Sequence, residues 1–276
     1  MMTRQGRRLL TTAGAFCLVA LAACGPGGSG AADTKAPTSA IPVTFVARPG
    51  LSPTAEALPR LAGDSPTIAS INADLDRVDA MDAGDLTECA SEGGGWNRTI
   101  LKPMTGPGYV TLWIAQDYYC GGAYPATSQT ALTYDLATGQ RIDWVAAIPG
   151  LGLTTDSPEG LPEGYVLNLR SAALAVWYGA RMMANPDAEW VEQCRSVFEI
   201  ERLAETGFRI WADAENGGVS VSPDFPHVTQ ACADSATMTA ADLGRFNADP
   251  ALLEAIAVAR AAGNWAPKET PESDAA

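Results

Sequence analysis

The spacing of apolar residues along the chain predicts a mixture of helices and strands. Ser65 and Pro66 suit the cap and the first turn of a helix. The apolar residues that follow recur every three or four positions, so they would share one face of that helix. They are Ile68, Ile71, Leu75 and Val78. Gly84 is expected to end the helix, because glycine is common just past a helix C-terminus.

Runs of β-branched and aromatic residues predict the strands. Tyr109 to Tyr119 forms one such run, and Gln129 to Leu136 forms a second. Further along, Phe208 to Ala212 and Val219 to Val221 flank the sequence Glu215-Asn216-Gly217-Gly218. Asn-Gly between two apolar runs is a strong signal for a β-hairpin.

Longer apolar runs predict helices in the second half of the chain. Leu167 to Ala184 is expected to form one helix, which Asn185-Pro186 ends, and Ala188 to Phe198 to form another. Thr239 and Asp249 are candidate caps of two further helices. The inward-facing positions are expected at Leu169, Ala173, Val176, Ala180 and Met183 in the long helix, and at Leu253, Ile256 and Ala257 in the last.

The N-terminus has the layout of an export signal. Three arginines precede an apolar run from Leu9 to Ala23, which at ~15 residues is shorter than the ~20 that span a bilayer. The run ends in Leu21-Ala22-Ala23-Cys24, which resembles a bacterial lipobox and implies that Cys24 is acylated and becomes the mature N-terminus. An ordinary secretory signal that happens to contain a cysteine is the alternative.

These features divide the chain into four parts. Residues 1–23 are a lipoprotein signal peptide, 24–45 a flexible tether, 46–260 a folded α+β domain and 261–276 a disordered tail. Gly25 follows Cys24, where an Asp would resemble an inner-membrane retention signal. The expected location is therefore the outer membrane, facing the periplasm, in a cell with two membranes, and otherwise the outer face of the plasma membrane. The membrane would be contacted through the lipid.

The net charge of the chain limits the classes of molecule that it could bind. The chain carries a formal net charge of -14 and has a pI near 4.4, and removal of a signal with three arginines lowers the charge to about -17. Nucleic acid is excluded as a partner, because binding phosphates requires a basic face. An acidic surface would instead attract cationic partners.

Cysteine usage indicates an oxidising compartment. Once Cys17 is lost with the signal and Cys24 carries lipid, four cysteines remain, and an even number in an exported chain predicts two disulfides. Three pairings are possible. The pairing Cys89–Cys120 with Cys194–Cys232 is favoured, since each bond would join neighbouring segments of one half of the chain. A zinc site would need close C-x-x-C pairs, which the sequence lacks, so no metal or other cofactor is expected.

No constellation of residues in the sequence identifies a catalytic site. His227 is the single histidine, and neither G-x-S-x-G nor H-E-x-x-H occurs. Asp117, Asp135 and Asp143 are the best-placed carboxylates for paired-acid glycan hydrolysis, because they fall at predicted strand ends near a Gly-Gly loop. Asp135 and Asp143 equally suit a turn and a cap. The interpretation without an enzymatic role is therefore favoured.

A more specific pattern lies between residues 118 and 144. Tyr118-Tyr119-Cys120-Gly121-Gly122-Ala123-Tyr124-Pro125 is followed by Tyr134-Asp135-Leu136-Ala137-Thr138-Gly139-Gln140 and by Ile142-Asp143-Trp144. This block resembles the exported domain of lysozyme-sensing anti-sigma factors of the RsiV type, a domain related to an accessory module of peptidoglycan deacetylases. The positions that carry the resemblance are Gly121, Gly122, Tyr124, Pro125, Tyr134, Asp135, Thr138 and Gly139.

The resemblance implies an α+β fold in which helices pack on an antiparallel sheet. Tyr124 stands where that family has a histidine, and Ala126 where it has an asparagine. The function expected on this basis is that of a lipid-anchored envelope protein that binds a cationic protein such as lysozyme, or a cell-wall fragment. A carboxylate-dependent hydrolase of envelope glycans and a structural assembly lipoprotein are the alternatives.

Overall fold

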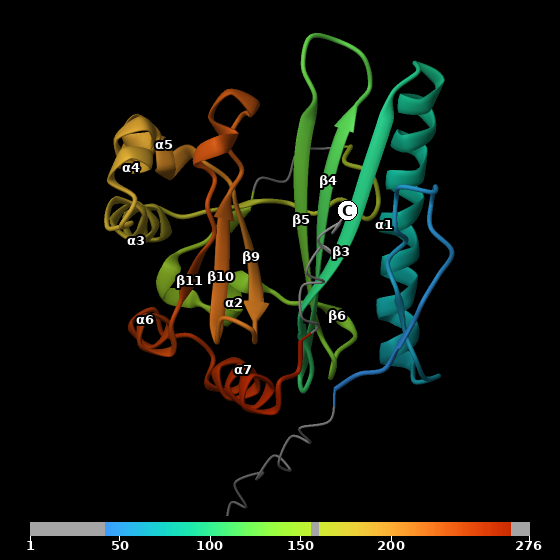
Figure 1. The fold of residues 1–276 in the computed structure, drawn as a ribbon. Helices are drawn as coiled ribbons and strands as arrows, with labels where there is room; N and C mark the ends of the chain where they lie inside the picture. The colour runs from blue at the N-terminus through green and yellow to red at the C-terminus, as the bar shows by residue number, and fades with distance from the viewer. Residues whose placement is uncertain (1–41, 156–159, 266–276) are drawn as a thin grey trace, which may run out of the picture. The chain divides into compact units, whose positions relative to one another are not determined.

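The computed structural model describes residues 42–155 and 160–265, all within one compact unit, Pro37–Ala276. The unit is an α+β fold in which a long helix, a four-stranded sheet, a five-stranded sheet and a group of helices follow one another as layers (Figure 1). Every strand pair in the described residues is antiparallel. The predicted fold class is thus confirmed.

The first half of the fold pairs one helix with one sheet. Helix α1 (Pro66–Ser91) covers one face of the sheet, which has the strand order β3-β4-β5-β6. The strands are β3 (Gly95–Thr105), β4 (Tyr109–Tyr119), β5 (Ala126–Asp135) and β6 (Gln140–Arg141). Two short strands, β1 (Phe45–Val46) and β2 (Arg60–Leu61), pair with each other beside α1. The core between helix and sheet contains Leu58, Ile71, Leu75, Val78, Val110, Leu112, Ile114, Leu132 and Tyr134.

The second half is a five-stranded sheet with helices on its outer face. Its strand order is β11-β10-β9-β8-β7. The strands are β7 (Thr154–Thr155), β8 (Leu169–Arg170), β9 (Phe208–Asp213), β10 (Gly218–Pro223) and β11 (Ala236–Met238). The helices are α2 (Trp144–Ala147), α3 (Ala172–Met183), α4 (Ala188–Cys194), α5 (Ile200–Glu205), α6 (Ala240–Arg245) and α7 (Pro250–Ala262), with 3-10 turns η1 (Pro149–Leu151), η2 (Arg195–Val197) and η3 (His227–Cys232).

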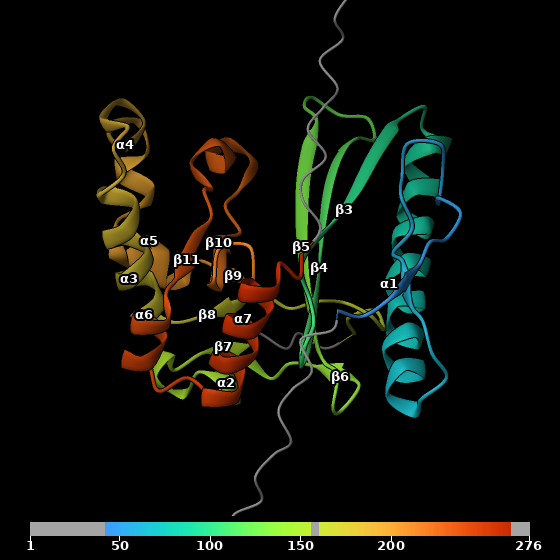
Figure 2. The ribbon, with the colours of Figure 1, turned by 60° about the horizontal axis from the view of Figure 1, so that its bottom comes forward.

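The two sheets face each other along β9. In both ribbon views, β3, β4 and β5 lie between α1 and β9 (Figures 1 and 2). The indole rings of Trp113 on β4 and Trp211 on β9 meet with their centroids 4.3 Å apart. The backbone N–H of Ala214 donates to the carbonyl of Pro103 at 3.0 Å, which joins the end of β9 to β3. The opposite face of β9 and β10 carries apolar residues that pack against the helices.

Several predicted elements are confirmed. Strand β4 has the predicted bounds, and the β9–β10 hairpin forms around the Asn-Gly turn. Ser65 caps α1 by accepting a hydrogen bond from the N–H of Ile68. Thr239 and Asp242 form a reciprocal capping box at the start of α6. Local capping and turn chemistry therefore act in this fold as the sequence indicates.

Other predicted elements are wrong in position. Helix α1 runs through Gly84 to Ser91, because apolar positions continue to Cys89, which is buried. Helix α3 begins at Ala172, five residues later than expected, since Leu169 and Arg170 form a strand and Ser171 is the cap. Its buried positions are Leu174, Ala175, Tyr178, Gly179 and Met182, whereas Val176, predicted to face inward, is 50% exposed. In α7 the buried positions are Leu252, Ala255, Ile256 and Ala259 rather than Leu253 and Ala257.

The folded body extends past both predicted boundaries. Val43 already donates its N–H to the carbonyl of Thr105 within the segment predicted as tether. At the other end, α7 reaches Ala262, and buried Asn264 bonds through its backbone and side chain to Thr105 and Gly106. The predicted signal peptide, with Cys24, lies outside the described residues.

Both predicted disulfides are confirmed. Cys89 at the end of α1 is bonded to Cys120 just after β4, and Cys194 at the end of α4 is bonded to Cys232 at the end of η3. Across the described ranges, no helix combines the length and apolar character needed to cross a bilayer.

Candidate functional site

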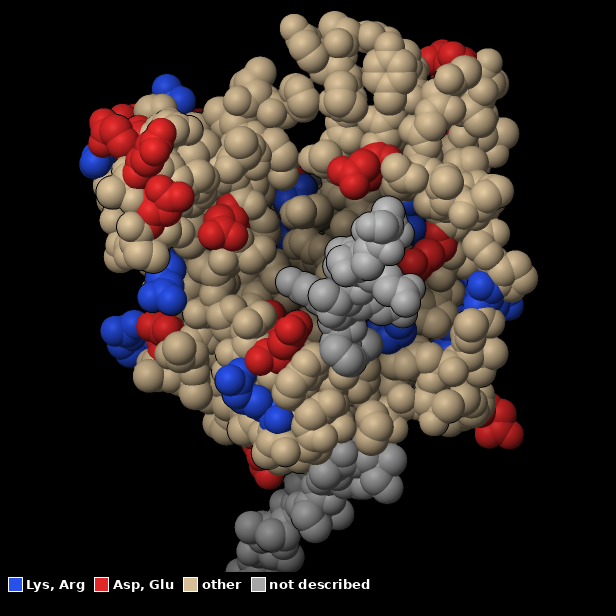
Figure 3. Space-filling model, viewed as in Figure 1, with Lys and Arg blue, Asp and Glu red and all other residues tan. Residues whose placement is uncertain are grey.

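The face of the first sheet that points toward the second sheet is only partly covered. Its lower part is buried at Thr111, Trp113 and Thr133. On the same face, alternation places Asn97 and Asp117 nearer the β4–β5 loop, and both are exposed. Figure 3 shows the surface hollowed between the two halves, with both acidic and basic side chains around the hollow. The fold thus has a cleft between its two sheets.

A pocket of about 290 Å³ opens between the two sheets, and we call it the inter-sheet pocket. Residues from six strands line it, among them Leu101, Trp113, Gln129, Trp211, Asp213, Ser220 and Thr237. Its volume is close to the ~300 Å³ at the lower end of the range for small-ligand sites. Two indole rings and several polar groups therefore converge in a space that fits one small molecule.

A chain of hydrogen bonds orders the polar wall of this pocket. Asp213, which is 3% exposed, accepts from the hydroxyl of Ser220 at 2.6 Å and from the side-chain amide of Asn216 at 2.8 Å. The hydroxyls of Ser220 and Thr237 lie 2.7 Å apart. Since the Ser220 hydroxyl donates its one proton to Asp213, the Thr237 hydroxyl must be the donor in the Ser220–Thr237 pair. Thr237 is left with only acceptor capacity.

On the facing sheet, Gln129 presents a polar atom without a partner. Its amide oxygen is buried, and no donor among the described residues hydrogen-bonds to it. Leaving a buried acceptor unpaired costs ~1–3 kcal/mol. The backbone carbonyl of Gln129 accepts from Nε of Arg209 at 2.5 Å, so the strand is held against β9 at this residue.

Two exposed loops meet at one end of the cleft. Tyr124, in the β4–β5 loop, stacks on His227, at the start of η3, with ring centroids 5.8 Å apart. Tyr124 is 72% exposed and Val228 is 88% exposed. Each loop is fixed by a disulfide close by, at Cys120 and at Cys232. We call Tyr124, His227 and Val228 the rim.

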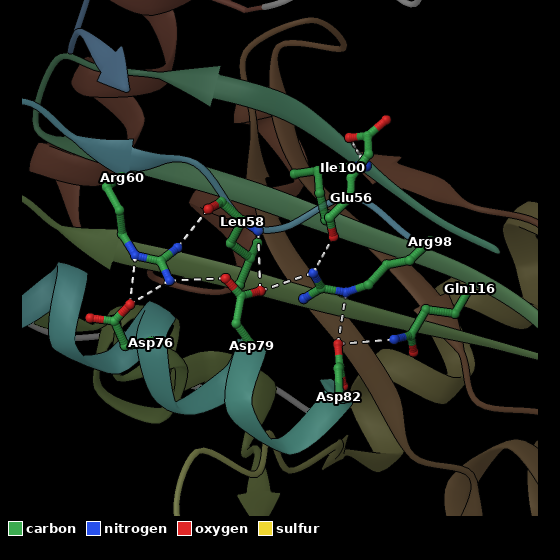
Figure 4. Close-up of polar contacts among 9 residues, drawn as sticks. All are labelled: Glu56, Leu58, Arg60, Asp76, Asp79, Asp82, Arg98, Ile100 and Gln116. Atoms are coloured by element: carbon green, nitrogen blue, oxygen red, sulfur yellow. Dashed lines mark hydrogen bonds and ion pairs between the residues drawn. The ribbon is translucent and has the colours of Figure 1, made fainter. Parts of the chain in front are cut away.

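A second polar cluster is buried on the other side of the first sheet (Figure 4). Asp79 and Asp82 project from α1 toward the sheet and are 7% and 8% exposed. The guanidinium of Arg98, on β3, lies 2.9 Å from Asp79 and 2.8 Å from Asp82. Arg60, on β2, forms a second ion pair with Asp79 at 2.9 Å. The cluster ties helix, sheet and N-terminal segment together.

The remaining partners in this cluster are backbone and amide groups. Arg98 donates to the carbonyl of Glu56 at 2.6 Å, and Arg60 donates to the carbonyl of Leu58 at 2.6 Å. Gln116 donates to Asp82 at 2.9 Å. Burial raises the pKa of Asp82, an effect that the charge of Arg98 opposes. Most of these groups are paired within the cluster, although Nη2 of Arg98 is buried without a hydrogen-bond partner among the described residues. The cluster does not line the inter-sheet pocket, so we assign it a structural role.

The structure does not bring Asp117 and Asp135 together. Asp117 pairs across the sheet with Thr127, whereas Asp135 pairs with Tyr109 at the opposite end of β4, roughly 27 Å away at 3.4 Å per residue. Asp135 accepts from the N–H of Ala137, and Asp143 caps α2. Hydrolysis by two carboxyl groups needs a separation of ~5–10 Å. Asp117 and Asp135 do not meet that requirement.

The residues of the family-like block occupy turns and core positions. Gly121 and Gly122 have φ values of 89° and 90°, which favour glycine, and they lead to Tyr124 and exposed Pro125. The side chain of Tyr134 is buried, and its hydroxyl donates to Asp74 at 2.7 Å. Thr138 accepts from the N–H of Gln140, and Gly139 approaches the backbone of α1. Of this block, Tyr124 is the residue at the rim.

The inter-sheet pocket is not among the sites predicted from the sequence. The sequence does contain an indication of it, because polar and apolar residues alternate along the strands of the predicted hairpin. Arg209, Trp211 and Asp213 alternate with apolar residues, and Ser220 does so on the neighbouring strand. Polar residues on one face of otherwise buried strands indicate a second, polar layer.

The chain matches no protein-family model, and no curated protein is significantly similar to it. In the part of the chain that the structure describes, no three His, Cys, Asp or Glu side chains are grouped so that they could hold a metal ion.

Proposed function

We propose that this chain is a lipid-anchored protein of the bacterial cell envelope that binds a cationic protein at the open end of the inter-sheet cleft. The export signal and Cys24 support the anchor. The two disulfides support an oxidising compartment outside the cytoplasm, where such bonds persist. The membrane is the outer one, facing the periplasm, in a cell with two membranes, and otherwise the plasma membrane.

The observation that carries the proposal is the distribution of charge. The formal net charge is -14, and many arginines are already engaged with carboxylates of the same chain, such as Arg98 with Asp79 and Arg209 with Asp224. Around the hollow in Figure 3, acidic side chains lie on both sides, together with several basic ones. A protein with this net charge attracts basic proteins and accelerates their encounter with it.

The rim supplies the contact that would hold such a partner. Tyr124 and Val228 are large, exposed and adjacent to the cleft, and exposed aromatic residues often dominate binding energy at interfaces. The disulfides at Cys120 and Cys232 reduce the flexibility of both loops, which lowers the entropy lost on binding. The resemblance of the Gly121–Pro125 segment to lysozyme-sensing domains points to lysozyme as the first partner to test.

The test is a calorimetric titration of the full-length protein, in detergent, with lysozyme. Binding is expected at low salt and weaker binding at 0.5 M salt, where the Debye length falls below ~10 Å. Tyr124→Ala is expected to weaken binding at both salt concentrations, by about tenfold or more. Tyr165→Ala is the matched control, because Tyr165 is also exposed but its carbonyl contacts Arg141, outside the cleft.

A second basic protein separates specific capture from general attraction. Cytochrome c is suitable, and it is expected to bind more weakly than lysozyme and to be insensitive to Tyr124→Ala. Equal binding of both proteins, or none of lysozyme at low salt, would contradict the proposal.

A further inference from the structure

We propose that the inter-sheet pocket is a binding site for a neutral sugar ring. The inference goes beyond the proposed capture of a protein and does not depend on it. The pocket lies between the sheets, among residues of β3, β4, β5, β9, β10 and β11. Its volume of about 290 Å³ fits one small molecule.

Each wall offers a ligand one hydrogen-bond acceptor. Gln129 on one sheet has a buried amide oxygen that receives no hydrogen bond from the described residues. Thr237 on the other sheet donates to Ser220 and retains only its lone pairs. A ligand that places donors on two sides at once would pair the unpartnered Gln129 oxygen and also bond to Thr237. Hydroxyl groups around a pyranose ring have that arrangement.

The indole rings supply the apolar part of the site. Trp113 and Trp211 are tilted by 46° to each other, and both line the pocket. A sugar ring has C–H faces that pack against aromatic surfaces while its hydroxyls bond at the edge. Mixed aromatic and polar lining with a few convergent hydrogen-bonding groups is typical of small-ligand sites.

The charged side chains that line the pocket indicate which class of sugar it would bind. Asp213 and Glu215 line the pocket together with a single cation, Lys102, whose ammonium group lies over the ring of Phe45 at 5.8 Å from its centroid. An anionic sugar would meet two carboxylates and is disfavoured. A cationic ligand is not required, because the buried carboxylate of Asp213 already receives hydrogen bonds from Ser220 and Asn216.

The test uses three probes of similar size and different charge. N-acetylglucosamine, glucosamine and glucuronate are titrated into the full-length protein in a sugar-free detergent, and binding is followed by tryptophan fluorescence and calorimetry. The neutral sugar is expected to bind with a Kd of ~1 mM, as suits a ligand of this size. Glucuronate is expected to bind at least about tenfold more weakly.

Two substitutions locate the site. Gln129→Leu and Thr237→Val are each expected to weaken N-acetylglucosamine binding by about tenfold. Gln140→Leu is the matched control, because Gln140 is exposed and its side chain bonds to Ser70 outside the pocket. Gln129→Leu is also expected to leave the Tm unchanged or raise it, since it removes an unpaired buried acceptor. Loss of binding with retained stability is a result that a purely structural residue would not produce.

Three results would overturn the inference. They are the absence of any response to the neutral sugar at about 20 mM, a preference for glucosamine or glucuronate over it, and unchanged binding in Gln129→Leu. Lysozyme is not used in this test, so its outcome is separate from that of the proposed function.

Discussion

Arg98 gives the sharpest test of how the fold is held together. Its side chain is fully buried, and it contacts Asp79 and Asp82 within 2.9 Å and 2.8 Å. Removing one member of a buried ion pair costs ~3–5 kcal/mol, because the other charge is left without compensation. In Arg98→Met, Asp79 would keep its pair with Arg60, whereas Asp82 would keep only Gln116. We therefore expect Arg98→Met to lower the free energy of unfolding by ~3–5 kcal/mol at pH 7, chiefly because the buried charge of Asp82 loses its partner.

The stability of the Arg98→Met variant should also depend on pH. Burial already raises the pKa of Asp82 above 3.8, and the loss of the Arg98 charge would raise it further. Above pH 3.8 and up to that raised pKa, the folded variant binds a proton that the unfolded chain does not. Its stability therefore increases as the pH falls, by up to ~1.4 kcal/mol per pH unit. The cost of Arg98→Met should be smaller at pH 5 than at pH 7.

Urea unfolding of the full-length protein in detergent, followed by tryptophan fluorescence, measures both effects. The double variant Arg98→Met with Asp82→Asn is expected to recover about half of the loss or more, because it removes the uncompensated charge. Arg195→Met is the control, since its pair with Glu192 is exposed and worth ~0–1 kcal/mol. A loss below ~1 kcal/mol for Arg98→Met, or an equal loss at both pH values, would show that Arg98 does not compensate the buried charge of Asp82.

Three further predictions concern stability. Gly139→Ala should destabilise the protein by ~1–2 kcal/mol or more in urea unfolding, because its φ is 72° and a Cβ would lie 2.7 Å from the backbone of Thr67. Thr239→Ala should cost ~1 kcal/mol by removing the cap of α6; an unchanged urea midpoint would show that the capping box contributes nothing. Replacing Cys194 and Cys232 with Ser should cost ~2–4 kcal/mol and lower the Tm, whereas a Tm equal to that of the parent would contradict a stabilising role for this bond.

Local signals in the sequence were sufficient where one interaction decides the structure. Ser65 caps α1, the Asn-Gly turn forms the β9–β10 hairpin, and the disulfides join segments that are close in the chain. Helix α3 shows where such signals fail. It is apolar around most of its circumference, so spacing alone did not separate buried Tyr178 from exposed Val176.

The candidate site depends on contacts between segments that are distant in the chain. The spacing of apolar residues along the sequence does not reveal such contacts. Gln129 and Thr237 lie more than one hundred residues apart and become neighbours only because β9 packs across the first sheet. The buried cluster around Arg98 has the same origin, since its carboxylates come from α1 and its cations from β2 and β3. Periodicity predicted a helix face in that region, but it did not indicate that Asp79 and Asp82 belong to the buried side.

The most direct test of the proposed function is a hydrogen-exchange footprint of lysozyme on the full-length protein at low salt. Exchange is expected to slow in residues 118–125 and 224–235, the two loops at the open end of the cleft, and to stay unchanged along the outer face of α1. Protection confined to α1, or exchange that lysozyme leaves unaltered everywhere, would contradict it.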